Sequence, residues 1–314
     1  MLRALSIEIG GTKLQLVLGD ERGNIHQRRK LTVARGSGAD GIREQIARHL
    51  PELLAGTAID AAGVGFGGPV DRRTGKICCS HQITGWSEFA LGDWLEAQTG
   101  VPVFVDNDAN VAALGEAACG AGVGSNPVFY VTLGSGVGGG LVVNGSIYHG
   151  ATPGESEIGH VRLDRSGATV ESRCSGWAVD ARIRKLKTAV VPSLLAKLSA
   201  EDSTGEARHL AEAVAQGDAE AIRILRELVE DLAFGLSHVT HLVHPQMIVL
   251  GGGLSGVGEP LRAGVETALR AFTMEAFAPG PRICLADLGE DAVPVGALLL
   301  ACAGMERRGA RVVA

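Results

Sequence analysis

The sequence predicts an α/β protein with two similar halves, and three observations support this prediction. Residues 5–18 and residues 128–143 each form a pair of short apolar runs joined by a glycine-rich polar turn, which is typical of two strands. A third stretch, residues 101–118, changes from a short apolar run through a polar cluster into good helix formers. The polar cluster, residues 106–110, lies between the predicted strand and the predicted helix.

The remaining elements follow from apolar periodicity and from turn residues. We expect strands at residues 5–9, 14–18, 25–33, 61–66, 101–105, 128–133, 141–143, 246–250 and 282–286. We expect helices at residues 41–54, 88–99, 111–118, 218–243, 257–276 and 293–302. Pro51 should kink or restart the first helix. Residues 1 to about 116 therefore form one α/β unit, and the pattern repeats after it.

Composition excludes several classes of protein. The 314 residues carry a net charge of -6, which argues against nucleic acid as the main partner. No signal peptide and no apolar run of membrane-spanning length is present, and the six cysteines form no CxxC pair, so we expect a reduced, cytoplasmic protein. The 45 glycines are about twice the usual share, so several loops must bring backbone close to a ligand or to other backbone.

The polar cluster contains Asp106, Asn107, Asp108 and Asn110. Open α/β sheets place their ligands at the carboxyl ends of strands, where this cluster lies. The alternative is helix capping, because Asp and Asn are preferred N-cap residues. One cap needs one such residue, so the excess favours a functional site.

Three glycine-rich segments are candidate nucleotide loops. Residues 10–13, with Glu8 upstream, offer inward-pointing N–H groups, a hydroxyl and an ammonium to a phosphate, although a plain hairpin is the alternative. Residues 134–140 form the corresponding loop of the second half, and the two loops could hold a polyphosphate between them. A dinucleotide fingerprint is excluded there, because a strand and not a helix follows. Residues 251–253 join a strand to a helix, the expected position of a ribose or phosphate.

Six motifs stand in one order along nearly the whole chain. They are IEIGGTK (7–13), GFGGPVD (65–71), VDNDANVAALGE (105–116), VTLGSGVGGGLVVNG (131–145), EIGH (157–160) and HPQMIVLGGG (244–253). Together they resemble the ROK family of sugar kinases and repressors, within the actin-like ATPase superfamily. The ordered set is far more specific than any single motif.

The resemblance implies a two-domain actin-like ATPase (ribonuclease H-like) sugar kinase fold with a central cleft. Residues 1–117, completed by a C-terminal helix at 292–314, would form the small domain, and residues 118–291 the large domain with the nucleotide site. It implies an ATP- and Mg²⁺-dependent hexose kinase of glucokinase type, cytoplasmic and homodimeric. Asp108 would be the general base that takes the proton of the attacking sugar hydroxyl.

The resemblance also assigns residues to two sets. The sugar-binding set is Gly68, Asn107, Asp108, Glu157, His160 and Glu171. The set for ATP and Mg²⁺ is Glu8, Gly10, Gly11, Thr12, Lys13, Gly134, Ser135, Gly136, Gly138, Gly251, Gly252 and Gly253.

The sequence departs from the family pattern at four places. Glu8 stands where Asp is usual and Ser135 where Thr is common. Residues 81–83 read His-Gln-Ile where an Asn-Leu pair is common, and this difference bears on sugar specificity. Many members have a three-cysteine zinc loop after E-x-G-H. Between His160 and Glu171 there is no cysteine, and Cys174 alone cannot build a tetrahedral site, so we expect no zinc.

The sequence features described above are also compatible with other functions. The same residues fit a kinase for N-acetylglucosamine, N-acetylmannosamine, fructose or another hexose. A non-catalytic sugar sensor is a rival, favoured by Glu8 but opposed by Asp108, by both phosphate loops and by the lack of a DNA-binding segment. A chaperone-type or cytoskeletal ATPase of the same superfamily is opposed by the EIGH motif and the short length.

Overall fold

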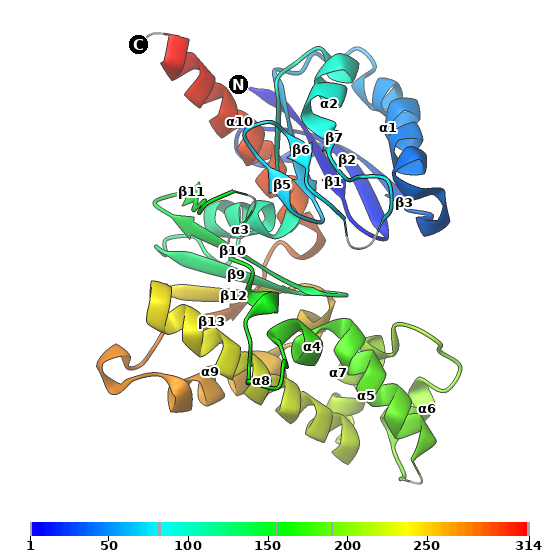
Figure 1. Ribbon diagram of the computed structural model, residues 1–314, viewed down its shortest axis with the longest axis vertical. Helices are drawn as coiled ribbons and strands as arrows, with labels where there is room; N and C mark the ends of the chain where they lie inside the picture. Colours follow the sequence, from blue (N-terminus) through cyan, green and yellow to red (C-terminus); the bar gives the residue numbers. More distant parts are fainter. Residues whose placement is uncertain (1, 81–82, 153, 155, 190, 313–314) are drawn as a thin grey trace. The chain divides into compact units, whose positions relative to one another are not determined.

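The computed structural model describes residues 2–80, 83–152, 154, 156–189 and 191–312, and these group into two compact units (Figure 1). The first unit consists of Met1–Val123, Gly145–Glu155 and Glu290–Ala314, and the second of Gly124–Asn144 and Ser156–Gly289. The units differ from the predicted domains at residues 118–123, 145–155 and 290–291, which lie in the first unit. Helix α3 (Asp108–Cys119) continues past residue 117, and Ile147 of β11 (Ser146–Ile147) packs against it.

The first unit contains a five-stranded sheet in the order β3-β2-β1-β4-β8. Its strands are β1 (Arg3–Ile9), β2 (Lys13–Asp20), β3 (Ile25–Thr32), β4 (Ala61–Phe66) and β8 (Val103–Asn107). β1, β2 and β3 are antiparallel, as the predicted meander requires, whereas β1, β4 and β8 run parallel. A small antiparallel sheet follows β4, from β5 (Val70–Asp71), β6 (Lys76–Ile77) and β7 (Phe89–Ala90).

Helices cover both faces of this sheet. The helices are α1 (Gly38–Leu54), α2 (Leu91–Thr99), α3 and α10 (Ala292–Val312, red in Figure 1), with a short 3-10 turn η1 (Arg35–Ser37) before α1 and another, η6 (Gly289–Asp291), before α10. Leu5 packs in one apolar cluster with α1 and α2, and its neighbour Ala4 packs with α10, as the alternation of a strand requires. α1 continues through Pro51 in its last turn, so the predicted restart there is wrong.

The approach of α10 to the sheet explains part of the glycine excess. A Cβ on Gly63 of β4 would lie 1.9 Å from the carbonyl oxygen of Ala297 in α10, far inside van der Waals contact. A side chain at Gly63 would push the helix off the strand. Glycine therefore sets the distance between α10 and the sheet.

Four strands of a five-stranded sheet, in the order β10-β9-β12-β13, belong to the second unit, and the edge strand β11 is the fifth. The four strands are β9 (Val128–Leu133), β10 (Val137–Val143), β12 (Met247–Gly251) and β13 (Arg282–Leu285). The prediction that residues 134–140 form a turn is wrong for its second half. Gly138, Gly139 and Gly140 pair with Thr132, Val131 and Tyr130 in the ladder, so the turn consists of residues 134–136.

The helices of the second unit pack around one apolar core. They are α4 (Val170–Cys174), α5 (Gly176–Thr188), α6 (Leu194–Leu198), α7 (Leu210–Ala215), α8 (Ala219–Val243) and α9 (Glu259–Phe272), with short turns η2 (Ile158–His160), η3 (Glu206–His209), η4 (Gly253–Val257) and η5 (Glu275–Phe277). α8 begins one residue after the predicted start and ends at the predicted Val243, and its apolar stripe is buried in the core. Asp218 caps it, because its carboxylate accepts from the N–H of Ala221 at 2.7 Å.

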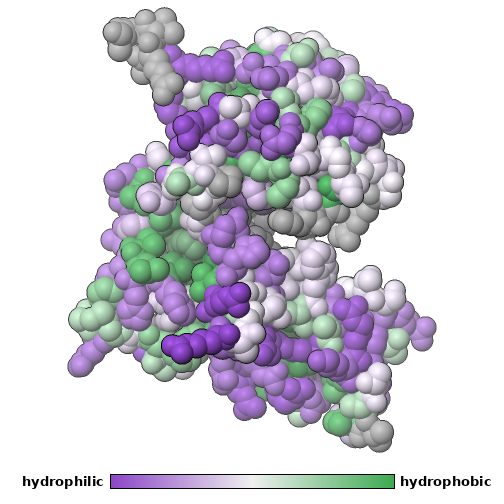
Figure 2. All heavy atoms as spheres, in the orientation of Figure 1, coloured by the Kyte–Doolittle hydropathy of each residue, from purple (hydrophilic) through white to green (hydrophobic). Residues whose placement is uncertain are grey.

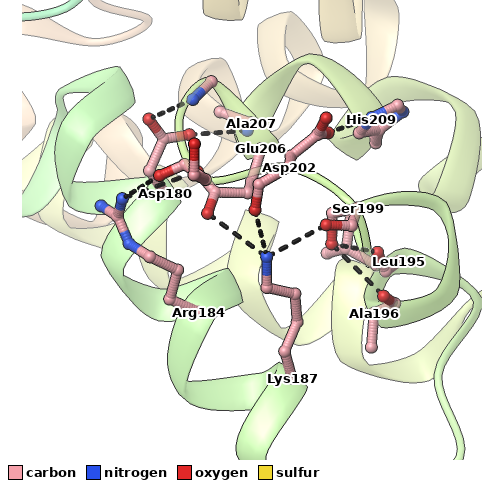
Figure 3. A network of polar contacts seen from close by, with 12 residues as sticks. Asp180, Arg184, Lys187, Leu195, Ala196, Ser199, Asp202, Glu206, Ala207 and His209 are labelled. Atoms are coloured by element: carbon pink, nitrogen blue, oxygen red, sulfur yellow. Dashed lines mark hydrogen bonds and ion pairs between the residues drawn. The ribbon is translucent and has the colours of Figure 1, made fainter.

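A buried network of charges ties α5 to η3 in the second unit (Figure 3). The side chain of Glu206 is 0% exposed, and its carboxylate lies 3.5 Å from Lys187 Nζ and 3.7 Å from Arg184 Nη1. Lys187 Nζ also donates to the carbonyl oxygens of Ser199 at 3.0 Å and Asp202 at 2.7 Å. One lysine thus holds three separate segments of this unit.

Hydrophilic residues cover most of the face drawn in Figure 2. Among the described helices, none is both long and apolar enough to cross a bilayer. All six cysteines are free thiols, and Cys174 is fully buried in the core of the second unit. Burial raises the pKa of the Cys174 thiol well above its ordinary value, so this thiol stays protonated.

Candidate functional site

The parallel strands of the first unit end level with one another. Ile9 of β1 is paired with Phe66 of β4, and Phe66 is paired with Asn107 of β8. The segments that begin at Gly10, at Gly67 and at Asp108 therefore leave the sheet at the same edge. Sequence motifs that lie about 40 to 60 residues apart meet there, at the carboxyl ends of strands where α/β sheets place ligands.

Asn107 and Asp108 have different roles at the start of α3. Asn107 is the N-cap: its Oδ1 accepts from the N–H of Ala109 at 2.9 Å, and its Nδ2 donates to the carbonyl oxygen of Gly68 at 3.2 Å. Asp108 is the first helical residue and is half-buried, and its Oδ2 would lie 3.4 Å from a Cβ at Gly67. Asn107 is therefore the residue that fills the capping role considered for this cluster.

The second carboxylate of the cluster, Asp106, is held inside the protein. Its Oδ2 lies 2.7 Å from Nε2 of His149, and its Oδ1 accepts from the N–H of Asn107 at 2.8 Å and from the side chain of Asn110 at 3.1 Å. Asp106 is only 4% exposed. It supports the turn, and this leaves Asp108 as the carboxylate of the pair that can meet a substrate.

Glu8 lies opposite the turn of residues 10–13 and is bound on both sides. Lys13 Nζ lies 2.9 Å from its Oε1, and Gln15 Nε2 donates to its Oε2 at 2.7 Å. Burial raises the pKa of the Glu8 carboxyl, whereas the charge of Lys13 and the hydrogen bonds from Lys13 and Gln15 act in the opposite direction.

Sequence reasoning missed Gln15. The signal was its spacing: Lys13 and Gln15 stand two apart on β2, so their side chains share one face of the strand. The hairpin register pairs Gln15 directly with Glu8. Gln15 Oε1 is buried and has no hydrogen-bond partner among the described residues, so it offers an acceptor beside the Glu8 carboxylate.

In the second unit, the turn of residues 134–136 meets two other segments. The N–H of Gly134 donates to the carbonyl oxygen of Gly136 at 3.0 Å, and the N–H of Gly176, the first residue of α5, donates to the carbonyl oxygen of Gly134 at 2.7 Å. Gly252 has a φ of +80°, and a Cβ there would lie 2.6 Å from the backbone of Leu133. Only glycine fits at residue 252, so the loops after β9 and β12 lie together.

Three predicted sugar-binding residues also belong to the second unit. Glu157 directly precedes η2 and His160 is its last residue, and both are exposed. Glu171, in the first turn of α4, is half-buried, and its Oε2 accepts from the N–H of Val137 at 2.9 Å, beside the turn of residues 134–136. The specificity positions His81 and Gln82 lie outside the described residues.

The predicted site residues thus form two groups, one in each unit. The first group is Glu8, Gly10, Gly11, Thr12, Lys13, Gly68, Asn107 and Asp108, and the second is Gly134, Ser135, Gly136, Gly138, Glu157, His160, Glu171, Gly251, Gly252 and Gly253. Each group combines a tight glycine turn with carboxylate side chains. Backbone N–H groups in such turns bind phosphate oxygens, and carboxylates accept hydrogen bonds from hydroxyls.

Comparison with known proteins gives matches over nearly the whole chain. A sequence model of the ROK family matches residues 4–303. The chain is 31% identical over 314 residues to a glucokinase of Halalkalibacterium halodurans, covering 93% of this chain and 92% of that protein. It is similar to the crystal structure of a ROK family glucokinase from Streptomyces griseus in complex with glucose and AMPPNP, with a TM-score of 0.81, 31% identity, and 95% and 99% of the two chains covered.

A ROK family transcriptional regulator, described as a homolog of the MLC protein of E. coli, has a TM-score of 0.85 at 22% identity. The match covers 95% of this chain and 77% of the regulator, and it is a likeness of fold alone. Together with the glucokinase structure, it confirms the predicted actin-like sugar kinase fold.

Proposed function

Because the chain belongs to the ROK family, we propose that it transfers the γ-phosphate of ATP to a hydroxyl of a hexose, with Asp108 as the general base and glucose as the first candidate substrate. The glucokinases that match the chain support an ATP-dependent hexose kinase, a phosphotransferase with an alcohol group as acceptor. The observation that carries the role of Asp108 is its place at the start of α3, half-buried, level with the ends of β1 and β4.

In this proposal the sugar-binding residues, besides Asp108, are Gly68, Asn107, Glu157, His160 and Glu171. Asn107 uses one amide N–H on Gly68, and its amide carries a second N–H that can donate to a sugar hydroxyl. Asp108 accepts the proton of the attacking hydroxyl, a contribution of about 10²–10⁴ in rate. Its position on a helix terminus fixes the carboxylate before the substrate arrives, which favours an aligned attack.

The phosphates of ATP are bound by the turns at residues 10–13 and 134–136, with Gly251, Gly252 and Gly253 beside the adenosine. Mg²⁺ fits this donor set, because it takes hard oxygen ligands and usually one or two carboxylates besides the phosphates. Glu8 supplies a buried carboxylate, and Gln15 Oε1 is a buried acceptor next to it. When bound, the ion neutralises charge on the phosphates.

A coupled ADP-release assay with ATP, Mg²⁺ and a panel of hexoses, amino sugars and ketoses tests this function. We expect one sugar to give a much higher kcat/KM than the others, with glucose first. If the enzyme prefers N-acetylglucosamine, N-acetylmannosamine or fructose, the assignment as a kinase stands and glucose is replaced as the proposed substrate. High ATP turnover that no sugar stimulates would contradict a sugar kinase and favour another ATPase of the superfamily.

A non-catalytic sugar sensor is the second candidate, and the binding of Glu8 favours it. Both Glu8 oxygens are bound by Lys13 and Gln15, and the extra methylene relative to Asp changes how the carboxylate reaches a metal hydration shell. Calorimetric titration separates the two functions. A sensor binds a sugar but no nucleotide, whereas the kinase binds both.

We expect the purified protein to contain no stoichiometric zinc. Among the described residues, no group of three or more His, Cys, Asp or Glu side chains could hold a metal ion. The Cys174 thiol is buried, with Sγ 3.8 Å from the carbonyl oxygen of Leu228, and is not poised to act as a thiolate ligand. Elemental analysis after exhaustive dialysis checks this, and one zinc per chain would contradict it.

The proposal also covers the cellular compartment of the enzyme and its oligomeric state. We expect a cytoplasmic enzyme, as the free cysteines favour, and a homodimer, as the family resemblance implies. Light scattering at micromolar concentration measures the assembly directly.

A further inference from the structure

A cavity of about 720 Å³ lies in the first unit, away from the candidate site. It is bounded by the turn between β5 and β6, by α2, by the edge strand β8 and by the end of α10. Asp106 and His149 form part of its wall, whereas neither Asp108 nor the turn at residues 10–13 does. Its volume is within the range of about 300–1,000 Å³ typical of small-molecule sites.

Four arginines line this cavity, which we call the arginine cavity: Arg72, Arg73, Arg307 and Arg308. They come from two segments more than 200 residues apart in the sequence, the β5–β6 turn and the last turns of α10. All four are exposed, so their guanidinium groups can be reached by a solute. The like charges of these four arginines repel one another, and a bound anion would offset that repulsion.

The acidic residues of the cavity neutralise only part of this charge, because Glu96 pairs with Arg308 and Asp106 is bound to a histidine. Asp106 is bound to His149 at 2.7 Å, and Glu96 lies 3.4 Å from Arg308 and accepts from the N–H of Val103 at 3.0 Å. Arg73 donates to the hydroxyl of Thr152 at 3.0 Å.

Three cations therefore face one remaining carboxylate. Within the described part of the chain, Arg72 and Arg307 form no ion pair, and neither does Asp93. Arg73 contributes the third positive charge: its guanidinium donates to the hydroxyl of Thr152, and its charge also acts on Asp71, which does not line the cavity. The arginine cavity thus has an excess of positive charge.

We propose that the arginine cavity binds a phosphorylated sugar, with its phosphate on Arg72 and Arg307 and a sugar hydroxyl on Asp93. Guanidinium groups bind phosphate through paired N–H donors, and a phosphate dianion matches two of them. Asp93 is an acceptor on the adjoining helix α2, and Phe104, over which Arg308 stacks at 5.3 Å, adds an apolar wall. The sugar part rests on the proposed function, whose product is such a compound, whereas the anion part does not.

Isothermal titration calorimetry on the full-length protein tests this. Hexose 6-phosphate is titrated into the enzyme saturated with the free hexose, so that the sugar site at Asp108 is already occupied. We expect one binding event, and we expect the double variant Arg72→Ala/Arg307→Ala to raise its Kd at least tenfold. The matched control Arg48→Ala removes an exposed arginine of α1 outside the arginine cavity and should keep the wild-type Kd. Thermal unfolding verifies that each variant is folded.

Two further titrations separate the phosphate from the sugar. Asp93→Asn should weaken hexose 6-phosphate severalfold and leave inorganic phosphate unchanged. Inorganic phosphate that binds as tightly as the sugar phosphate overturns the sugar part, and an unchanged Kd in the double arginine variant overturns the site. Because calorimetry needs no turnover, failure of the proposed kinase activity is read separately in the ADP-release assay.

Discussion

Replacing Asp108 with asparagine should lower kcat by about 10²–10⁴-fold and leave the affinity for the hexose nearly unchanged. Asparagine keeps the size of the side chain and can accept a hydrogen bond, but it cannot take a proton from the sugar hydroxyl. The fold should survive, because the cap of α3 is Asn107 and not Asp108. Steady-state kinetics with the best sugar, together with calorimetric titration of that sugar, separates kcat from binding.

The matched control is Asp40→Asn. Asp40 also lies in the first turn of a helix of the first unit, but its side chain is 81% exposed and it has no place in the candidate site. Its kcat should stay within twofold of the wild-type value. A near-normal kcat for Asp108→Asn would refute the general-base assignment, whereas loss of sugar affinity with unchanged kcat would make Asp108 a binding residue only.

Replacing Lys187 with methionine should destabilise the second unit by about 3 kcal/mol, the lower end of the cost of breaking a buried ion pair. The lower end applies because Arg184 remains 3.7 Å from the Glu206 carboxylate. The variant leaves Glu206, 0% exposed, with half of its positive partners, and it removes the donor of two backbone carbonyls. The midpoint of thermal unfolding of this unit should fall by roughly 6–12 °C.

Lys185→Met is the matched control for this change. Lys185 lies two residues away on α5 and is exposed, so its replacement should shift the midpoint by less than about 2 °C. The double variant Lys187→Met/Glu206→Met should regain most of the lost stability, because an apolar pair needs no neutralisation. A single variant as stable as the wild type would show that Arg184 alone balances Glu206.

The order of the strands was predictable because each strand is an apolar run bounded by turn residues. The predicted strand ends failed where glycines occur within a strand. Gly138–Gly140 read as a turn in the sequence, but their ladder partners on β9 keep them extended. No local signal distinguishes a glycine in a turn from one in a strand that needs a close neighbour. Gly139 is such a case, because a Cβ there would lie 2.5 Å from the carbonyl oxygen of Ser156.

The candidate site was predictable where a motif is contiguous and not where it depends on register. The polar cluster after β8 was visible in the sequence, but its division into a cap (Asn107), a buried support (Asp106) and a half-buried carboxylate (Asp108) depends on His149 and on the end of β4. The partner of Glu8, Gln15, likewise follows from the hairpin register. Long-range contacts of this kind are set by packing and leave no local pattern.

The first unit is built from both ends of the chain, and this has a consequence for biosynthesis. α10 supplies the apolar cover for one face of its sheet, yet residues 292–312 are translated after all the other residues of this unit. At about 5–20 residues per second, the ribosome needs roughly ten to forty seconds to extend the chain from residue 123 to residue 312. During that interval the apolar face that includes Ala4, Val17 and Ala61 is uncovered, so it can bind chaperones or aggregate. The second unit is nearly continuous in sequence and ends at Gly289, so it can fold before the first unit is complete.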